Sequence, residues 1–148
     1  MKTKKHNALR SGCPVNVVLE TLGDAWSFLI VRDLLFRERK TFNEFLHAEE
    51  KIATNILSNR LQRLEAAGIV SKQRDSDDTR RYIYRLTEKG IDLAPLLVEM
   101  VVWATKHEKT AMPPALVQQI TGNREAYIAD IRRRRQCELP ASCCPDSR

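Results

Sequence analysis

The sequence predicts a mainly α-helical fold with one small β-hairpin, and three features support this prediction. Segments before residue 68 and after residue 86 repeat apolar residues at helical spacing, between recognisable helix caps and stops. Between them the period changes in two short runs, IVSKQR and RRYIYRL, which the polar stretch DSDDT separates. The length of 148 residues allows one domain with its own core.

The N-terminal helices are predicted from their end signals. Pro14 suits the first turn of a first helix, and Gly23 suits its end. Asp24 can then cap a second helix that carries Trp26, Leu29, Ile30 and Leu34 on one face. The stretch TFNE at 41–44 has the pattern of a capping box and opens a short third helix.

After the hairpin, Thr87 is expected to cap a helix that runs to about Lys109, with Pro95 bending this helix rather than ending it. Between residues 91 and 104, 11 of 14 residues are apolar. This proportion exceeds what a helix on one side of a small core needs, so we expect burial on two sides and therefore a partner chain.

The remaining chain is predicted to form a helical extension. Pro113 and Pro114 interrupt the helical pattern. A short helix then runs to Ile120, and Asn123 can cap a last helix. We therefore divide the chain into a flexible N-terminus (1–12), a main domain (13–109), a C-terminal helical extension (110–136) and a Cys-containing tail (137–148).

The 53–67 helix has two distinct faces when residues are placed 100° apart. One arc of about 140° holds Ala53, Ile56, Leu57, Leu61 and Leu64. The opposite face presents Thr54, Asn55, Ser58, Asn59, Gln62 and Arg63. Such side chains hydrogen-bond base edges and phosphates in the major groove, which admits one helix. A solvated amphipathic helix is the alternative, although such helices usually carry Glu and Lys.

Arg60 lies within the apolar arc of this helix. Its stem can follow the core while its head reaches a phosphate or a carboxylate, and the sequence does not decide between them.

The hairpin adds positive charge beside this helix. From Ala53 to Leu86 there are seven Lys or Arg and four acids, a balance of +3. We expect Arg74, Arg80 and Arg81 to contact phosphates or the minor groove. The acids at the tip either pair with Arg80 and Arg81 or keep the tip away from DNA.

Composition and charge favour some classes of protein and argue against others. A net charge of +6 and a pI near 9.4 favour a polyanionic partner. The N-terminus has no signal-peptide core, and no apolar window reaches the roughly 18 residues of a membrane span, so we expect a cytoplasmic protein without a membrane partner. The histidines are scattered and no Gly-rich phosphate loop is present, so we expect no enzyme and no cofactor.

The four cysteines are expected to be reduced. They are Cys13, Cys137, Cys143 and Cys144, with no CxxC pair. A zinc site would need a further ligand from His6, His47 or His107, and the usual spacings are missing. We therefore expect no metal.

Four blocks together resemble a known family. They are CPVNVVLETLGDAWSFLIVRDLL, TFNEFL, ILSNRLQRLEAAGIV and YRLTEKG, and their order and spacing over residues 13–104 are similar to the HxlR family of winged helix-turn-helix transcriptional regulators. The resemblance implies a dimeric bacterial DNA-binding regulator, with dimer contacts from the first helix and from the helix after the wing. It implies a recognition helix over 53–67 and a wing over 71–85. Where the family often has Ser or Thr, Ala53 stands here, so the helix cap is expected to move to Thr54.

Cys13 resembles the position that some family members use as a redox sensor. It precedes Pro14 at the expected start of a helix, where the helix dipole and nearby Arg10 favour the thiolate. A thiolate can be oxidised or alkylated by an electrophile and so shift a dimer. The alternative is a small residue at a helix start without a sensing role.

The sequence thus predicts a homodimeric, sequence-specific regulator of double-stranded DNA, in which residues 13–109 form the winged helix-turn-helix DNA-binding and dimerisation domain. A repressor on a near-palindromic operator is the favoured form, with a small molecule, an electrophile or thiol oxidation as the effector. The rival hypothesis is a winged-helix protein-interaction module without specific DNA binding.

Overall fold

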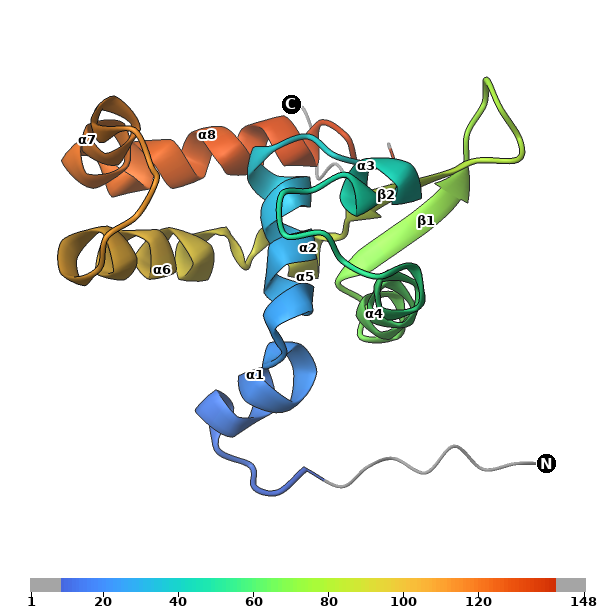
Figure 1. The fold of residues 1–148 in the computed structure, drawn as a ribbon, viewed down its shortest axis with the longest axis horizontal. Coiled ribbons are helices and arrows are strands. Elements are labelled where there is room, and N and C mark those ends of the chain that lie inside the picture. Colours follow the sequence, from blue (N-terminus) through green and yellow to red (C-terminus); the bar gives the residue numbers. More distant parts are fainter. Residues whose placement is uncertain (1–8, 141–148) are drawn as a thin grey trace, which may run out of the picture.

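The computed structural model describes residues 9–140 of the chain (Figure 1). The remaining residues include His6, Cys143 and Cys144, so most of the predicted flexible N-terminus and of the Cys-containing tail lies outside the described residues. The elements follow in the order α1 (Pro14–Leu22), α2 (Ala25–Phe36), α3 (Phe42–Leu46), α4 (Thr54–Ala66), β1 (Val70–Arg74), β2 (Tyr82–Leu86), α5 (Glu88–Ile91), α6 (Ala94–His107), α7 (Pro114–Gly122) and α8 (Arg124–Gln136). The mainly helical fold with one hairpin is confirmed.

The helix caps predicted at Asp24 and Thr41 are present. The Asp24 carboxylate accepts hydrogen bonds from the backbone N–H groups of Trp26 and Ser27, at 3.0 and 2.9 Å. The Thr41 hydroxyl accepts from the N–H of Glu44, whose carboxylate accepts from the N–H of Thr41 at 2.9 Å, which completes the capping box. These caps satisfy backbone donors that the first turn of a helix leaves without partners.

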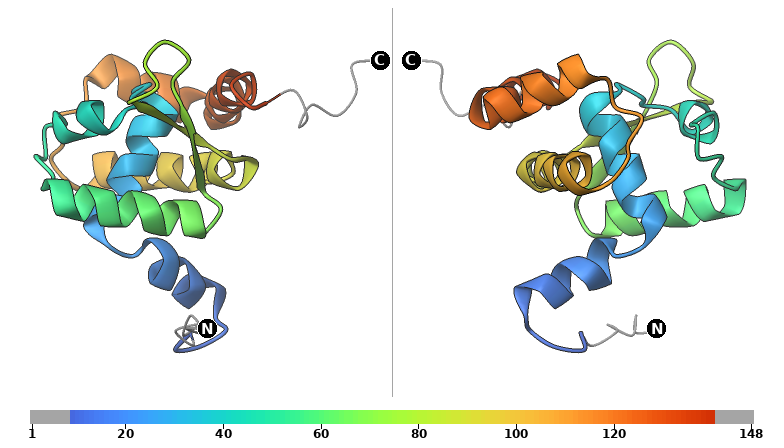
Figure 2. Two further views of the ribbon diagram at one scale, coloured as in Figure 1. Left: turned by 90° about the vertical axis from the view of Figure 1, so that its right-hand side faces the viewer. Right: turned by 60° about the vertical axis from the view of Figure 1, so that its left-hand side comes forward.

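Helix α2 passes through the centre of the molecule (Figure 1). Its fully buried residues include Val31 and Leu35, and the α4 leucines Leu57, Leu61 and Leu64 pack into the same core. In Figures 1 and 2, α4 and the hairpin lie on one side of α2, while α6, α7 and α8 lie on the other. The core thus joins the helix-turn-helix elements to the C-terminal helices.

The hairpin is an antiparallel pair with a simple register. Val70 pairs with Leu86 at its base, and Arg74 pairs with Tyr82 near its tip. Gly68 connects α4 to β1 with a φ of +72°, a backbone conformation that glycine adopts without steric cost. The N–H of Tyr84 donates to the Lys40 carbonyl at 2.7 Å, so the loop before α3 also contacts β2.

The predicted continuous helix after the hairpin is wrong. The chain forms the short α5 and then α6, and Asp92 and Leu93 separate them. Pro95 lies in the first turn of α6. Its nitrogen has no hydrogen to donate to the carbonyl four residues earlier, and its ring would clash there, so it begins a new helix rather than bending an old one. Thr87 caps α5 as expected, because its hydroxyl accepts from the N–H of Gly90.

The C-terminal extension packs on the rest of the molecule. The Asn123 side chain caps α8 by accepting from the N–H of Ala126 at 3.0 Å, as expected. Ile131 of α8 is buried in the main core, and Tyr127 stacks on Phe36 of α2 with ring centroids 6.4 Å apart. Arg135 is almost fully buried and bonds Glu38 and Glu138 at 3.0 and 2.9 Å.

No single helix among residues 9–140 has both the length and the apolarity to cross a membrane. Helices α1 and α2 reach those values only together, and the chain turns by 85° between them.

Candidate nucleic-acid interface

Helix α4 presents its predicted polar face to solvent. Leu57, Leu61 and Leu64 are at most 2% exposed and fix the orientation of the helix against the core. The side chains on the opposite face are all exposed: Thr54, Asn55, Ser58, Asn59, Gln62 and Arg63. In the left view of Figure 2, α4 lies across the front of the molecule with the hairpin above it. Its polar face is therefore accessible along its length.

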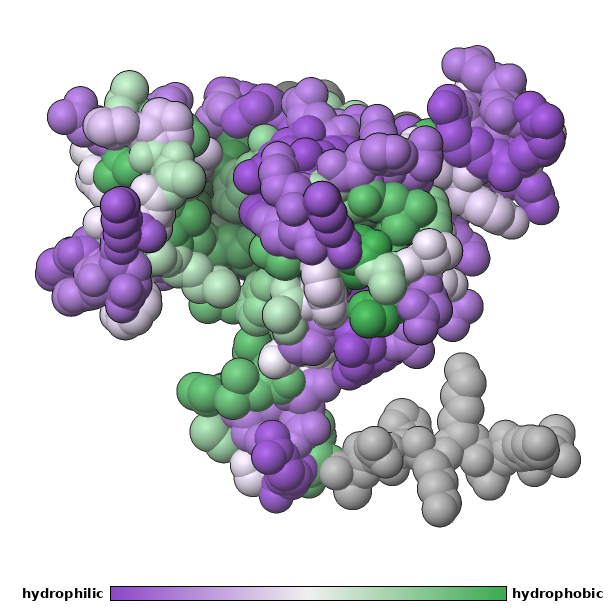
Figure 3. All heavy atoms as spheres, in the orientation of Figure 1, coloured by the Kyte–Doolittle hydropathy of each residue, from purple (hydrophilic) through white to green (hydrophobic). Residues whose placement is uncertain are grey.

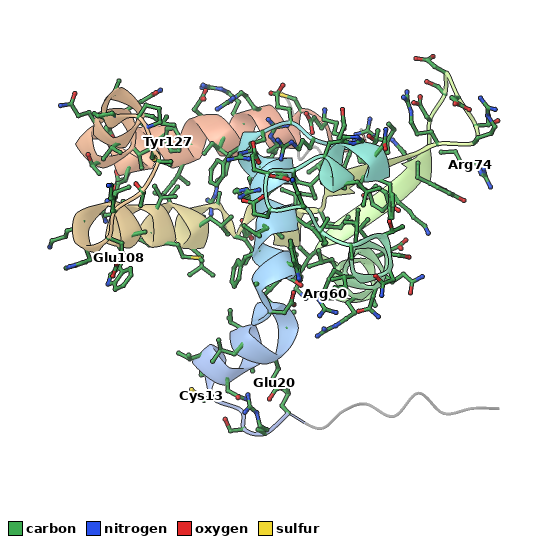
Figure 4. All side chains as sticks on the ribbon, viewed as in Figure 1. Cys13, Glu20, Arg60, Arg74, Glu108 and Tyr127 are labelled. Atoms are coloured by element: carbon green, nitrogen blue, oxygen red, sulfur yellow. The ribbon has the colours of Figure 1, made fainter. Side chains whose placement is uncertain are left out.

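Arg60 connects this helix to the start of α2 (Figure 4). Its Nε donates to Asp24 Oδ1 at 2.9 Å, so of the two partners that the sequence left open, the carboxylate is the one present. Its Nη1 donates to Asn59 Oδ1 at 2.6 Å. Burial raises the pKa of Asp24, but hydrogen bonds from Ser27 and Arg60 outweigh this effect and hold the pKa below its usual value.

Asp24 and Arg60 are thus positioning residues that the sequence analysis did not assign. Together they fix the side-chain amide of Asn59 on the exposed face. The available signal was the placement of an arginine inside an apolar arc, since a buried guanidinium needs a carboxylate partner.

The start of α4 differs from the expectation in two respects. The N-cap is Ala53, not Thr54, and it provides no side-chain hydrogen bond. Ala53 is also exposed, although its place in the apolar arc predicted burial, because the cap residue lies outside the regular helix. The first backbone N–H groups of α4 therefore point outward without a capping side chain, in the position where a helix N-terminus attracts a phosphate.

The wing arginines are held within the hairpin. Arg80 and Asp78 form an ion pair at 3.1 Å, and Arg81 pairs with the buried Asp75 carboxylate. Hydrogen bonds from the N–H of Asp77 and from Arg81 lower the pKa of Asp75. Of the two roles that the sequence left open for the tip acids, pairing with Arg80 and Arg81 is the one present. Arg80 and Arg81 remain exposed, but their charge is partly compensated.

Arg74 is the last residue of β1 and lies next to the tip of the hairpin (Figure 4). It donates to the Thr79 carbonyl, and its guanidinium lies 5.0 Å from the ring centroid of Tyr82. The Lys72 ammonium lies at the same distance from that ring and 3.8 Å from Glu65. Two cations thus flank one aromatic side chain beside the C-terminal half of α4.

Comparison with known proteins identifies the architecture. The family model HxlR-like helix-turn-helix matches residues 21–112, which span α2 to α6 and include α4 and the hairpin. The chain belongs to the HxlR-like helix-turn-helix family. The winged helix-turn-helix fold and the family that the sequence predicted are therefore confirmed, and with them a role in DNA-binding transcription regulation.

Relatives in this family are regulators. The HTH-type transcriptional regulator YdeP of Bacillus subtilis is 31% identical over 97 residues, which cover 66% of this chain and 75% of YdeP. The oxidised form of the redox regulator HypR is 29% identical, with a TM-score of 0.58, over 66% of this chain and 100% of HypR. The reduced form of the transcriptional regulator YodB from B. subtilis is 32% identical, with a TM-score of 0.54, over 66% of this chain and 95% of YodB.

Cys13 lies at the N-cap of α1 and is exposed (Figure 4). The backbone N–H groups of Asn16 and Val15, at the start of α1, lower the pKa of its thiol. The expected influence of Arg10 is not the cause, since Arg10 forms an ion pair with Glu20 at 2.5 Å. The helix start rather than a neighbouring cation therefore favours the thiolate.

Helices α1 and α6 expose apolar side chains. On α1 they are Val15, Val17 and Leu19, and on α6 they are Leu96, Met100 and Trp103. Trp103 is 60% exposed and Val15 is 67% exposed. Figure 3 shows apolar surface over α1. Groups of exposed large apolar side chains such as these are typical of surfaces that contact another molecule.

Proposed function

We propose that this member of the HxlR-like family is a bacterial, homodimeric repressor that binds a near-palindromic operator. The observation that carries the proposal is the exposed face of α4. It presents hydroxyl and amide side chains in its first two turns, and its one acid, Glu65, lies in the last turn next to Lys72. This pattern suits base edges in the major groove.

A dimer would place two copies of this face in successive major grooves, about 34 Å apart. Thr54, Asn55, Ser58, Asn59 and Gln62 contact base edges in this hypothesis, and Arg63 contacts a base or a phosphate. Arg74, Arg80 and Arg81 of the wings contact flanking phosphates. An occupied operator blocks polymerase, which makes repression the simplest outcome.

The first experiment selects bound duplexes from a random pool and then measures the affinity of Asn59→Ala for the selected site. We expect a loss of about 1–3 kcal/mol of discrimination at one base pair, while affinity for unrelated duplexes changes little. Gln118→Ala, on the exposed surface of α7, is the control and should bind as the native protein does. Unchanged preference in Asn59→Ala would refute the base contact.

A protein-interaction module is the alternative function. The two differ in salt dependence, because each phosphate contact contributes about 0.9 to the slope of log affinity against log salt. A steep slope on the selected duplex supports the repressor, and the absence of any duplex preference supports the interaction module.

Regulation through Cys13 completes the proposal. Its exposure and its lowered pKa make the thiol a target for oxidants and electrophiles at the start of a helix with exposed apolar residues. The similarity to the redox regulator HypR points in the same direction. Repeating the selection with and without diamide, on the native protein and on Cys13→Ser, tests it. Equal loss of DNA binding in both proteins would exclude Cys13 as the sensor.

A further inference from the structure

A cavity of about 480 Å³ lies between α2 and α6 on one side and α7 and α8 on the other. We call it the extension pocket. Its walls include Phe28, Phe36, Val101, Leu116, Tyr127 and Arg134. Figure 3 shows an apolar hollow between the C-terminal helices and α2. A volume of this size lies within the range of small-molecule sites, about 300–1,000 Å³.

One wall of the extension pocket is aromatic. The rings of Phe36 and Tyr127 are stacked, with centroids 6.4 Å apart and planes inclined by 25°. Phe28 lines the same cavity from α2. Flat aromatic surfaces favour a ligand with a planar apolar body, since such rings stack in offset geometry.

Three arginines line the extension pocket, whereas no acid lines it. Arg32 is already engaged by Glu50 and Asp33. Arg134 has one ion pair, with Asp130 at 2.9 Å through Nη2, and half of its side chain is exposed. A guanidinium has five N–H donors, so Arg134 retains donors for an anionic group.

The walls come from two parts of the chain. Helix α2 and helix α6 lie within the matched residues 21–112, whereas α7 and α8 follow them. The cavity therefore exists only because the extension folds back on the family core. This position makes the extension a part of the site rather than an independent unit.

We propose that the extension pocket binds a small amphipathic anion with an aromatic body and one carboxylate or phenolate group. The apolar walls accept the body, and Arg134 accepts the charge, whereas Arg37 lines the same pocket but is already paired with Glu49. Two other occupants fit less well. Residues 141–148, ASCCPDSR, contain no large apolar side chain for an aromatic wall. Helix α1 of a second copy carries one acid, Glu20, which is already paired with Arg10 at 2.5 Å.

The test is titration calorimetry of the full chain, without DNA, with 2-naphthoate and with its neutral analogue 2-naphthamide. We expect naphthoate to bind at least tenfold more tightly than naphthamide, because only the anion engages Arg134. Since DNA is absent, the result does not depend on the proposed function as a repressor.

Three variants sharpen the test. Arg134→Gln should remove the preference for naphthoate. Arg133→Gln is the matched control, because Arg133 also pairs with Asp130 but lies outside the pocket lining, and it should leave binding unchanged. Leu116→Trp should block both ligands by filling the cavity, with circular dichroism confirming the fold. Equal affinity of the two ligands, equal behaviour of the two arginine variants, or tighter binding after removal of residues 141–148 would overturn the proposal.

Discussion

The orientation of the Asn59 side chain depends on Arg60, the next residue, and through Arg60 on Asp24 at the start of α2. Asp24 caps α2 and also accepts from Arg60, and Arg60 donates to the side-chain Oδ1 of Asn59. The Asn59 amide therefore presents its NH₂ donors outward, so the base edge that it meets should offer acceptors, such as N7 of a purine. The cap of α2 and the proposed base contact of Asn59 thus both depend on the Asp24 carboxylate.

Asp24→Asn separates these two roles. Asparagine caps helices about as well as aspartate, so we expect little change in the free energy of unfolding. It removes the charge that holds Arg60, so we expect weaker discrimination at the base pair assigned to Asn59. Urea unfolding and binding to single-base variants of the selected site measure the two effects. Asp24→Ala, which also removes the cap, should lose about 1 kcal/mol of stability in addition. A stable Asp24→Asn protein with full discrimination would contradict the coupling.

Glu49 makes stability depend on acid pH. Its own backbone N–H and the guanidinium groups of Arg39 and Arg37 lower its pKa from 4.5 to about 2. A carboxylate with a lowered pKa stabilises the folded state fully above pH 4.5, and this contribution is lost as the pH falls from 4.5 towards 2. Glu49→Gln should therefore flatten the stability curve in that window. Urea unfolding between pH 2 and 6, with Glu125→Gln as a surface control, measures it. Parallel curves for all three proteins would show that the Arg37 and Arg39 contacts do not persist in solution.

At the scale of the element, α4 lacks a capping side chain. Ala53 occupies the N-cap in an extended conformation and is exposed, so a serine hydroxyl can accept from the first turn without a clash. We expect Ala53→Ser to increase the free energy of unfolding by about 1 kcal/mol. Ala66→Ser, at the other end of the helix, is the control and should decrease it by about 0.5 kcal/mol, because serine is a weaker helix former than alanine. Equal effects of the two substitutions would argue against a cap at residue 53.

In the wing, the charges of Arg80 and Arg81 are partly compensated by acids of the same hairpin. Arg81→Ala should weaken binding to all duplexes alike, and Asp75→Asn should strengthen it, because the substitution releases Arg81 from its ion pair. We expect the slope of log affinity against log salt to fall by about 0.9 for the first variant if Arg81 meets one phosphate. Fluorescence anisotropy at several salt concentrations measures both. A slope that neither variant changes would exclude Arg81 from the phosphate contacts.

The elements also show what local sequence can and cannot predict. The caps at Asp24, Thr41 and Asn123 were predictable, because their hydrogen bonds reach only two or three residues along the chain. The break before Pro95 was not predicted, because the apolar pattern continues across it. The pattern does not show that the nitrogen of Pro95 cannot donate a helical hydrogen bond. The partner of Arg60 lies 36 residues away, and periodicity within one helix contains no information about such a contact.

At the scale of the whole molecule, α8 connects the extension to the helix-turn-helix. Arg135 bonds Glu38, 97 residues earlier, and Glu138 bonds both Arg135 and Lys40. Lys40 directly precedes the capping box of α3. The RRRR run looks like a solvated charge cluster in the sequence, but the fold buries Arg135 among carboxylates. Only the tertiary arrangement could reveal this contact.

The exposed apolar faces of α1 and α6 predict where two copies of the whole molecule associate. Trp103 is 60% exposed, so Trp103→Glu should fold normally yet disfavour a dimer by placing a charge in the interface. Sedimentation velocity should show a lighter species, while Lys106→Glu, on the same helix, keeps the native size.

Each separated chain still presents α4 to a half-site, but the second contact is no longer intramolecular, and linked contacts typically gain about 10²–10⁴ in affinity. Operator affinity should therefore fall by a comparable factor, while affinity for an isolated half-site stays the same. A Trp103→Glu protein of native size and native operator affinity would show that this face is not where the two chains meet.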